Sequence, residues 1–276
     1  MKNKKIVKYN ATYDAVFKAA FKQHTSCASL INSILGTNYL STDITFKDIE
    51  PSKLTVEGKG ILFDINLVTK NSLITLEMQK FKPKYDMTNR LLYYIFYNYA
   101  KTFYKNQEYI GLPVILICFT DYNFNKHNFI ETYTMNNGLN DEFSGIKMVF
   151  LDFTMPINCD NIELSKWMYL ITTKDFSNYE GGNVAMDDFV NKVLDLNNDD
   201  DWLYKLHEDL CEFEKMSAYN NGKNEGKKEG KKEGKKEMVQ EIILKLSSKK
   251  LSKELIAQYL DLTIDEVNSF LNWLPI

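Results

Sequence analysis

Apolar residues near the start of the chain recur at helical spacing. Segment 10–36 has the periodicity of one helix, and Gly36 follows Leu35 as a helix C-cap. Segment 44–51 predicts a short strand that stops at Pro51. The chain therefore begins with a helix and a strand. The apolar stripe of the helix is formed by Val16, Phe17, Ala20 and Phe21.

Strands and helices follow one another through the middle of the chain. The run "FDINLVTKNSLITLEMQ" (63–79) reads as two short apolar strands around a polar break. Segment 85–106 carries a broad apolar helical stripe, and the run 114–119 is continuously apolar, as is typical of a buried strand. This order predicts an α/β core with a mixed central sheet flanked by helices. Further strands are predicted at 129–135 and 146–153, and another helix at 161–173.

The composition changes near residue 198. We therefore expect a core domain at 1–197 and a helical connector at 198–221. The stretch "GKNEGKKEGKKEGKKE" (222–237) then repeats every four residues, with seven lysines and four glutamates. Glycine at every fourth position weakens a helix, and Glu–Lys pairs partly offset this, so a marginal helix and a solvated linker both fit. A charged run of this kind is more often a solvated face than a nucleic-acid contact.

A small helical tail, 238–276, follows the repeat. Two short amphipathic helices flank the turn "DLT", and Thr263 with Glu266 forms a capping box. The layout is like a helix-turn-helix, but a packing or dimerising appendage fits the pattern as well. If the protein forms a homo-oligomer, we expect it to assemble through these C-terminal helices.

Composition and charge bound the classes of function. The 276 residues suggest one large domain, or one domain with a small appendage. Hydrophobic residues make up 44% of the chain, which is enough for a core, and the net charge is −3. The molecule as a whole is therefore not built as a general polyanion binder. A local basic surface remains compatible with this charge, because steering depends on where the charge lies.

The cysteines and the apolar runs indicate in which cellular compartment we expect the protein. No two cysteines stand in a CxxC pair, so their spacing fits neither a zinc site nor a disulfide framework. The longest apolar run, 112–119, is too short to span a bilayer, and the basic N-terminus has no apolar segment after it. We expect a cytoplasmic protein with reduced thiols and no membrane partner. The cysteines are Cys27, Cys118, Cys159 and Cys211.

Asp64 and Glu77 stand inside otherwise apolar strands, and a hairpin would bring them together. If Lys70 and Asn71 form the loop, the residue numbers of each pair sum to 141, so Asp64 lies opposite Glu77. Strand alternation puts Gln79 on the same face and the apolar residues on the other. A loop of odd length would separate the carboxylates. The apolar face consists of Phe63, Ile65, Leu67, Ile74, Leu76 and Met78.

Two opposed carboxylates repel each other unless one is protonated or a cation lies between them. Directly opposed residues have Cβ atoms roughly 4.5–5.5 Å apart, and a divalent cation with oxygen ligands resolves the repulsion. The pair therefore fits a Mg²⁺ site. Two solvated carboxylates on an exposed face, with lysine neighbours, fit the pattern equally well.

The spacing of Asp64 and Glu77-Met78-Gln79 resembles the PD-(D/E)XK nuclease signature, in which an Asp and a (D/E)XK element lie on adjacent strands. The surroundings resemble one branch, the recombination-promoting nucleases and transposases, over roughly residues 8–270. The resemblance implies a restriction-endonuclease-like core with a helical C-terminal appendage. Five segments carry it in order: "YDAVFKAAF", "EGKGILFDI", "LEMQ", "NRLLYYIFYNYA" and "GLPVILICF".

The resemblance also implies an activity and a set of site residues. It implies a Mg²⁺-dependent DNA endonuclease that hydrolyses phosphodiester bonds in DNA recombination or mobile-element processes. Asp64, Glu77 and Gln79 are then the catalytic residues, and Asp14, Asp64 and Glu77 the metal ligands. Asp14 fits equally well as a first-turn acid that stabilises the helix dipole. The chain departs from the signature at Phe63, which stands where a proline is usual, and at Gln79, which replaces the lysine. A neutral amide can orient a water but cannot stabilise phosphate charge as a lysine does.

Arg90, Tyr94 and Lys101 are the candidate DNA contacts. Their spacings of four and seven place them on one stripe of the predicted helix, and a guanidinium there can grip a phosphate. The tyrosine fits equally well as a core aromatic. Two other readings stay open: a catalytically degenerate nuclease fold that binds DNA or a protein, and an interaction protein assembled through its helical tail.

Overall fold

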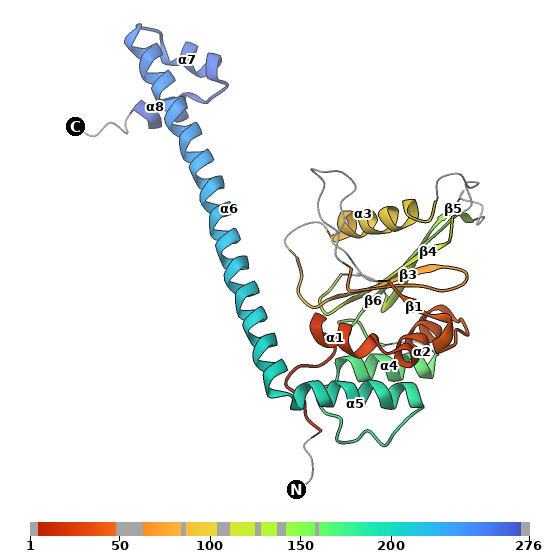
Figure 1. Ribbon diagram of the computed structural model, residues 1–276. Helices are drawn as coiled ribbons and strands as arrows, with labels where there is room; N and C mark the ends of the chain where they lie inside the picture. The colour runs from red at the N-terminus through yellow and green to blue at the C-terminus, as the bar shows by residue number, and fades with distance from the viewer. Residues whose placement is uncertain are drawn as a thin grey trace. The chain divides into compact units, whose positions relative to one another are not determined.

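The computed structural model describes residues 5–47, 63–83, 87–103, 111–124, 128–136, 142–157 and 160–271. By its internal contacts the chain divides into two compact units, Met1–Tyr204 and Lys205–Ile276. The first unit is a sheet with helices on both faces, and the second is helical (Figure 1). No described helix combines the length and the apolar character needed to cross a membrane.

The first unit is built around a six-stranded mixed sheet. Its strand order is β1-β2-β3-β4-β6-β5, in which β3, β4 and β6 run parallel and the other neighbours antiparallel. The predicted α/β class with a mixed central sheet is therefore confirmed. The strands are β1 (Thr45–Phe46), β2 (Ile65–Val68), β3 (Leu73–Gln79), β4 (Val114–Thr120), β5 (Ile130–Asn136) and β6 (Glu142–Asp152).

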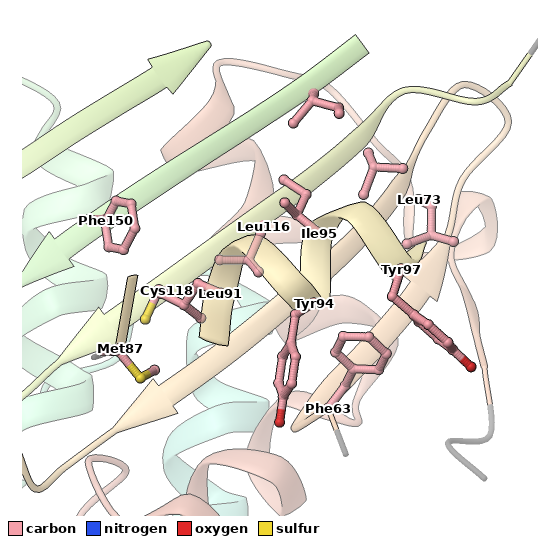
Figure 2. Packing of buried hydrophobic residues seen from close by; sticks show 12 residues of the cluster. Phe63, Leu73, Met87, Leu91, Tyr94, Ile95, Tyr97, Leu116, Cys118 and Phe150 are labelled. Carbon is pink, nitrogen blue, oxygen red and sulfur yellow. The ribbon is translucent and has the colours of Figure 1, made fainter. Parts of the chain in front are cut away.

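Helices cover both faces of this sheet (Figure 1). α3 (Met87–Ala100) connects β3 to the parallel strand β4 and lies on one face. Figure 2 shows the apolar cluster between them, in which Leu91 and Ile95 of α3 pack over Leu116 of β4. The other helices of the unit lie on the opposite face. They are α1 (Asp14–Phe21), α2 (His24–Leu35), α4 (Ile162–Thr172) and α5 (Val184–Asn198), with a short 3-10 turn, η1 (Ser41–Asp43), after α2.

The single helix predicted over 10–36 is in fact two helices. Lys22 ends α1 and Gln23, in an extended conformation, begins α2. Both helices contact α5, but α1 also packs on the sheet, where Phe17 meets Phe119 at 5.3 Å between ring centroids, whereas α2 also packs against α4. Tertiary packing thus overrides a periodicity that runs on through the break. The predicted cap is confirmed, because Gly36 ends α2 with a φ of 66°.

One expectation about the first unit is wrong, and one of its helices was not predicted. Phe63 was assigned to the face of Ile65, yet its ring packs on the α3 side, 5.1 Å from the ring of Tyr94. The reason is that β2 begins only at Ile65, after a bend at Asp64, so strand alternation does not extend to Phe63. The pattern also left 174–197 without a helix, but α5 lies there, capped by the Asn183 side chain.

Several predicted features lie at or beyond the edge of the described residues. The predicted helix 85–106 is α3, which ends at Ala100 and is followed by a turn at Lys101. Its residues 85–86 and 104–106 lie outside the described ranges, as do the glycine-rich approach 57–62 and Cys159.

The second unit contains most of one long helix and two short ones. α6 (Asp200–Ser248) runs without a break through the predicted connector and the Gly-Lys-Glu repeat, so the repeat is helical. α7 (Lys253–Leu260) and α8 (Ile264–Leu271) follow. The predicted capping box is confirmed, because Glu266 N–H donates to Thr263 Oγ1 and Thr263 N–H to Glu266 Oε2. A small core of Ile243, Ile256, Ala257 and Val267 holds the three helices together.

Candidate active site

The hairpin of β2 and β3 has the register that the pattern predicts. Thr69 N–H donates to Ser72 O at 2.9 Å across the two-residue loop, and Ile65 pairs with Leu76. The residue numbers of every pair in this ladder sum to 141. Continued by one residue, this register brings Asp64, directly before β2, beside Glu77, near the end of β3.

Both carboxyl groups are withdrawn from solvent. Asp64 is 8% exposed and Glu77 is 0% exposed. Asp64 N–H donates to Glu77 Oε1 at 3.3 Å, and Met78 N–H donates to Asp64 Oδ2 at 2.7 Å. Each carboxyl group thus accepts a backbone hydrogen bond from the other strand. The alternative of two solvated carboxylates on an exposed face is wrong.

A lysine of α1 joins this pair to a third acid. Lys18 Nζ lies 3.1 Å from Asp64 Oδ1 and 2.9 Å from Asp14 Oδ2. Asp14 is the first residue of α1 and its side chain is 53% exposed. Asp14 and Lys18 are one helical turn apart, so they lie on the same side of α1. The structure thereby brings Asp14 and Asp64 to a common cation.

The protonation of these groups reflects burial and mutual repulsion. Burial, reinforced by the charge of Asp14, raises the pKa of Asp64 to about 7, although Lys18 and the Met78 N–H oppose the shift. Burial and the charge of Asp64 raise the pKa of Glu77 well above its usual range. Burial alone would lower the pKa of Lys18, but Asp64 and Asp14 together raise it. The raised pKa favours the charged form of Lys18, while the raised pKa values of Asp64 and Glu77 favour their protonated forms.

Glu77 also has an uncompensated oxygen. Among the described residues, its Oε2 is buried and accepts no hydrogen bond. Cys118 pairs with Glu77 in the β3–β4 register, and its thiol has a pKa raised by burial and by the charges of Glu77 and Asp64. A buried acceptor without a donor is costly. A proton or a cation at this oxygen would remove that cost.

Residues 11–182 match the family described as PD-(D/E)XK nuclease family transposase. The chain belongs to this family. Its mixed sheet with helices on both faces is the restriction-endonuclease-like fold that the resemblance implied. Neither a curated protein nor a solved structure gives a match to the chain. Membership implies a hydrolase that acts on DNA, and PD-(D/E)XK nucleases generally use divalent metal ions.

The donor atoms at this site are oxygens of the kind that a hard cation binds. Asp14, Asp64 and Glu77 are oxygen donors coupled to one another electrostatically, and Glu77 Oε2 is an orphan acceptor. Within the described residues, no three His, Cys, Asp or Glu side chains are grouped closely enough to hold a metal ion as they stand. The ammonium of Lys18 provides the positive charge between Asp14 and Asp64 instead.

The residue that replaces the signature lysine ends β3. Gln79 is partly buried and stands two residues after Glu77, opposite Thr120 of β4. Lys80 follows it, and its ammonium is engaged away from the pair: it donates to Thr12 Oγ1 at 2.7 Å and to Asp121 Oδ2 at 2.8 Å. It also lies 4.3 Å from the centroid of the Tyr13 ring. Lys80 therefore ties the end of β3 to the residues that precede α1.

The predicted DNA contacts divide into two places on α3. Arg90 Nε donates to the Tyr94 hydroxyl at 3.1 Å, and the charge of Arg90 acts on Glu77. Tyr94 is also a core aromatic, only 5% exposed (Figure 2). Lys101 lies beyond the other end of α3, with Nζ 4.4 Å from the centroid of the Tyr97 ring. Eleven residues of helix place Lys101 roughly 16 Å along the axis from Arg90.

Sequence reasoning missed the part that Lys18 plays. The segment "YDAVFKAAF" contains both Asp14 and Lys18, and their spacing of four was visible. The contact of Lys18 with Asp64 was not visible in the sequence, because it depends on how α1 docks on the sheet.

A separate polar cleft of about 680 Å³, lined in part by Asn32, Asn161 and Asn183, contains none of these acids.

Proposed function

We propose that this protein is a Mg²⁺-dependent DNA endonuclease that hydrolyses phosphodiester bonds in DNA recombination or mobile-element processes. One observation supports the proposal: the buried acids Asp64 and Glu77 meet at the end of the β2–β3 hairpin, and Lys18 links Asp64 to Asp14 at the start of α1. Buried acids with raised pKa values are characteristic of functional sites. In a chain of a nuclease family, their chemistry is that of cation ligands.

The residues have distinct tasks in this proposal. Asp14, Asp64 and Glu77 hold the divalent ion. When bound, such an ion supplies positive charge against the phosphate and lowers the pKa of water. The backbone donors at Asp64 and Met78 hold the two strand carboxylates in place before substrate arrives.

Three further side chains act on the DNA and the water. Gln79, at the end of β3, orients the attacking water. Arg90, held by the Tyr94 hydroxyl, grips a phosphate oxygen. Lys101, at the far end of α3, contacts the DNA backbone away from the reaction. A substitution at Lys101 should therefore weaken binding and spare the chemical step.

Supercoiled plasmid tests this function directly. The purified full-length protein should nick plasmid with Mg²⁺ and leave it intact with EDTA. Mg²⁺ should also raise the melting temperature, because a ligand that binds only the folded state stabilises it. NaCl at matched ionic strength controls for screening. Wild-type protein that neither nicks DNA nor gains stability with Mg²⁺ would contradict the proposal.

A second candidate function is a degenerate nuclease fold that binds DNA or a protein. The observation in its favour is that Gln79 replaces the lysine while Lys18 already neutralises Asp14 and Asp64. This candidate predicts that Mg²⁺ leaves the melting temperature unchanged and that DNA binding does not depend on the ion. The same two measurements therefore separate the two functions.

Location and assembly complete the proposal. We place the protein in the cytoplasm, where the free thiols of Cys27, Cys118 and Cys211 would stay reduced. Any homo-oligomer would form through the C-terminal helices. Light scattering of the full chain and of a form ending at residue 197 tests this, since only the full chain should self-associate.

A further inference from the structure

Lys18 places a positive charge among the acids of the site. Its Nζ lies 2.9 Å from Asp14 Oδ2 and 3.1 Å from Asp64 Oδ1, and its side chain is 27% exposed. We propose that Lys18 is a catalytic residue that provides, from α1, the ammonium missing at Gln79. This inference rests on the nuclease function proposed above and adds a residue to that same site.

The reaction needs a cation besides the one that activates water. The water oxygen forms a bond to phosphorus and loses a proton to the solvent. The bond from phosphorus to the leaving sugar oxygen breaks, and that oxygen takes up a proton, so the products are a phosphate monoester and a hydroxyl. Negative charge builds on the phosphate oxygens during the attack, and a fixed ammonium stabilises it. Gln79 carries no charge and cannot do this.

The position of Lys18 is fixed by the packing of α1. The residues on the apolar stripe of α1, including Phe17, are fully buried, and Phe17 packs on Phe119 of β4. Lys18 follows Phe17 in the sequence, and its ammonium lies against Asp64, directly before β2. A side chain on a rigid element holds a reacting group more accurately than one on a loop.

Among the described residues, Lys80 and Arg90 are two further cations near the end of the hairpin, and each has a partner of its own. Lys80 bonds to Thr12 and Asp121 and covers the Tyr13 ring. Arg90 approaches from α3, on the side of Glu77, and bonds to Tyr94. Within the part of the chain that the structure describes, the cation in contact with Asp64 is Lys18.

A simple counter-ion would occupy the same place, but it would behave differently when removed. A counter-ion competes with the divalent ion for Asp14 and Asp64, so its loss strengthens Mg²⁺ binding and leaves cleavage unchanged or faster. A catalytic ammonium acts on the phosphate, so its loss slows cleavage even though Mg²⁺ still binds. Mg²⁺ binding and the cleavage rate therefore separate the two roles.

The experiment uses full-length protein and four variants. Lys18→Met removes the charge, and Lys18→Gln removes it while keeping a donor for Asp64, in case the first variant does not fold. The double variant Lys18→Gln with Gln79→Lys moves the ammonium to the usual position. Lys22→Met, at an exposed site that ends α1, is the matched control. Each protein is measured for Mg²⁺-dependent melting temperature and for the single-turnover rate of plasmid nicking.

The expected result is a loss of rate without a loss of Mg²⁺ binding. Removal of one group that stabilises transition-state charge costs about 10²–10³-fold in rate, and we expect this for both Lys18 variants. The Mg²⁺-induced rise in melting temperature should be at least as large as in wild type. The double variant should recover at least about tenfold of the lost rate, and Lys22→Met should match wild type.

Three outcomes would overturn the inference. One is nicking by Lys18→Gln at the wild-type rate or faster. Another is loss of nicking together with loss of Mg²⁺ binding, which would make Lys18 only a support for the acids. The third is no recovery in the double variant. Wild-type protein that binds no Mg²⁺ and cuts no DNA would instead remove the nuclease function itself, and this inference with it.

Discussion

Asp64 and Glu77 are opposite each other at the end of the hairpin, and Asp64 N–H donates to Glu77 Oε1 at 3.3 Å. The carboxyl group of Asp64 in turn accepts from Met78 N–H at 2.7 Å. Two buried acids are thus held by backbone donors, while the charge of Asp64 raises the cost of ionising Glu77. The arrangement is unfavourable for folding alone and is suited to a site that binds a cation.

Removing the charge of Asp64 should separate stability from activity. Asp64→Asn keeps the volume and an oxygen that can accept from Met78 N–H. Plasmid nicking should be abolished because a cation ligand is lost. The metal-free melting temperature should be unchanged or higher, since relief of a like-charge cross-strand pair is worth roughly 0.2–1 kcal/mol.

Two variants complete this comparison. Glu77→Gln should give the same two results from the facing strand. Gln79→Ala should slow nicking less than either, since an amide contributes orientation and not charge. An Asp64→Asn protein that melts normally and still nicks at the wild-type rate would remove Asp64 from the mechanism.

The metal-free protein should lose stability as the pH rises from about 4 to about 7. Burial raises the pKa of Asp64 from its usual 3.8 to about 7. Below the lower value Asp64 is protonated in both states. Between the two values the unfolded chain ionises while the folded protein keeps its proton, so unfolding becomes easier. The loss approaches about 1.4 kcal/mol per pH unit at most and stops above the folded pKa.

Urea denaturation in EDTA at a series of pH values measures this effect. Asp64→Asn should reduce the slope in that window but not abolish it, because Glu77, whose pKa is also raised, still titrates. Asp160→Asn, at an exposed position, should keep the wild-type slope. A wild-type profile that rises from pH 4 to 7 would show that Asp64 is stabilised in its ionised form.

The hairpin could be predicted from sequence because its determinants are local. Alternation of apolar residues and the loop at Lys70-Asn71 fix the register, so the pairing of Asp64 with Glu77 follows from spacing alone. The bend at Asp64 could not be predicted, since it depends on Phe63 turning to pack against Tyr94. Side-chain alternation therefore failed at Phe63, two residues before β2 begins.

The contacts of Lys18 show why the rest of the site could not be predicted from the sequence. Its spacing from Asp14 is set by the helix and is visible in the sequence. Its distance from Asp64 is set by the docking of α1 through Phe17, and no local pattern encodes that. The same holds for Lys80, whose partners Thr12 and Asp121 are remote in sequence.

Lys80 should be a stabilising residue that joins α1 to the sheet. Lys80→Met removes two hydrogen bonds to Thr12 and Asp121 and the cation–π contact with Tyr13. Charged hydrogen bonds of this kind contribute about 1.5–3 kcal/mol each when buried, and less when partly exposed as here. We expect a loss of about 1–2 kcal/mol in urea denaturation. The exposed neighbour Lys82→Met is the control, and an equal loss there would contradict the assignment.

The glycines of the α6 repeat should be the weak points of that helix. Gly222, Gly226, Gly230 and Gly234 have open space around the position of a Cβ. Changing all four to Ala should add up to ~1 kcal/mol of helix stability at each site. Wild-type chain should be cut first within 222–237 by limited proteolysis, because the repeat buries little apolar surface, and the quadruple variant should be cut there more slowly.

Gly36→Ala is the matched control: its Cβ would also meet nothing within 4 Å, but φ is 66°. Alanine there should lower the melting temperature of the first unit, since that backbone conformation strains any residue with a Cβ. Equal effects at Gly36 and in the repeat would show that the backbone conformation is not what separates them.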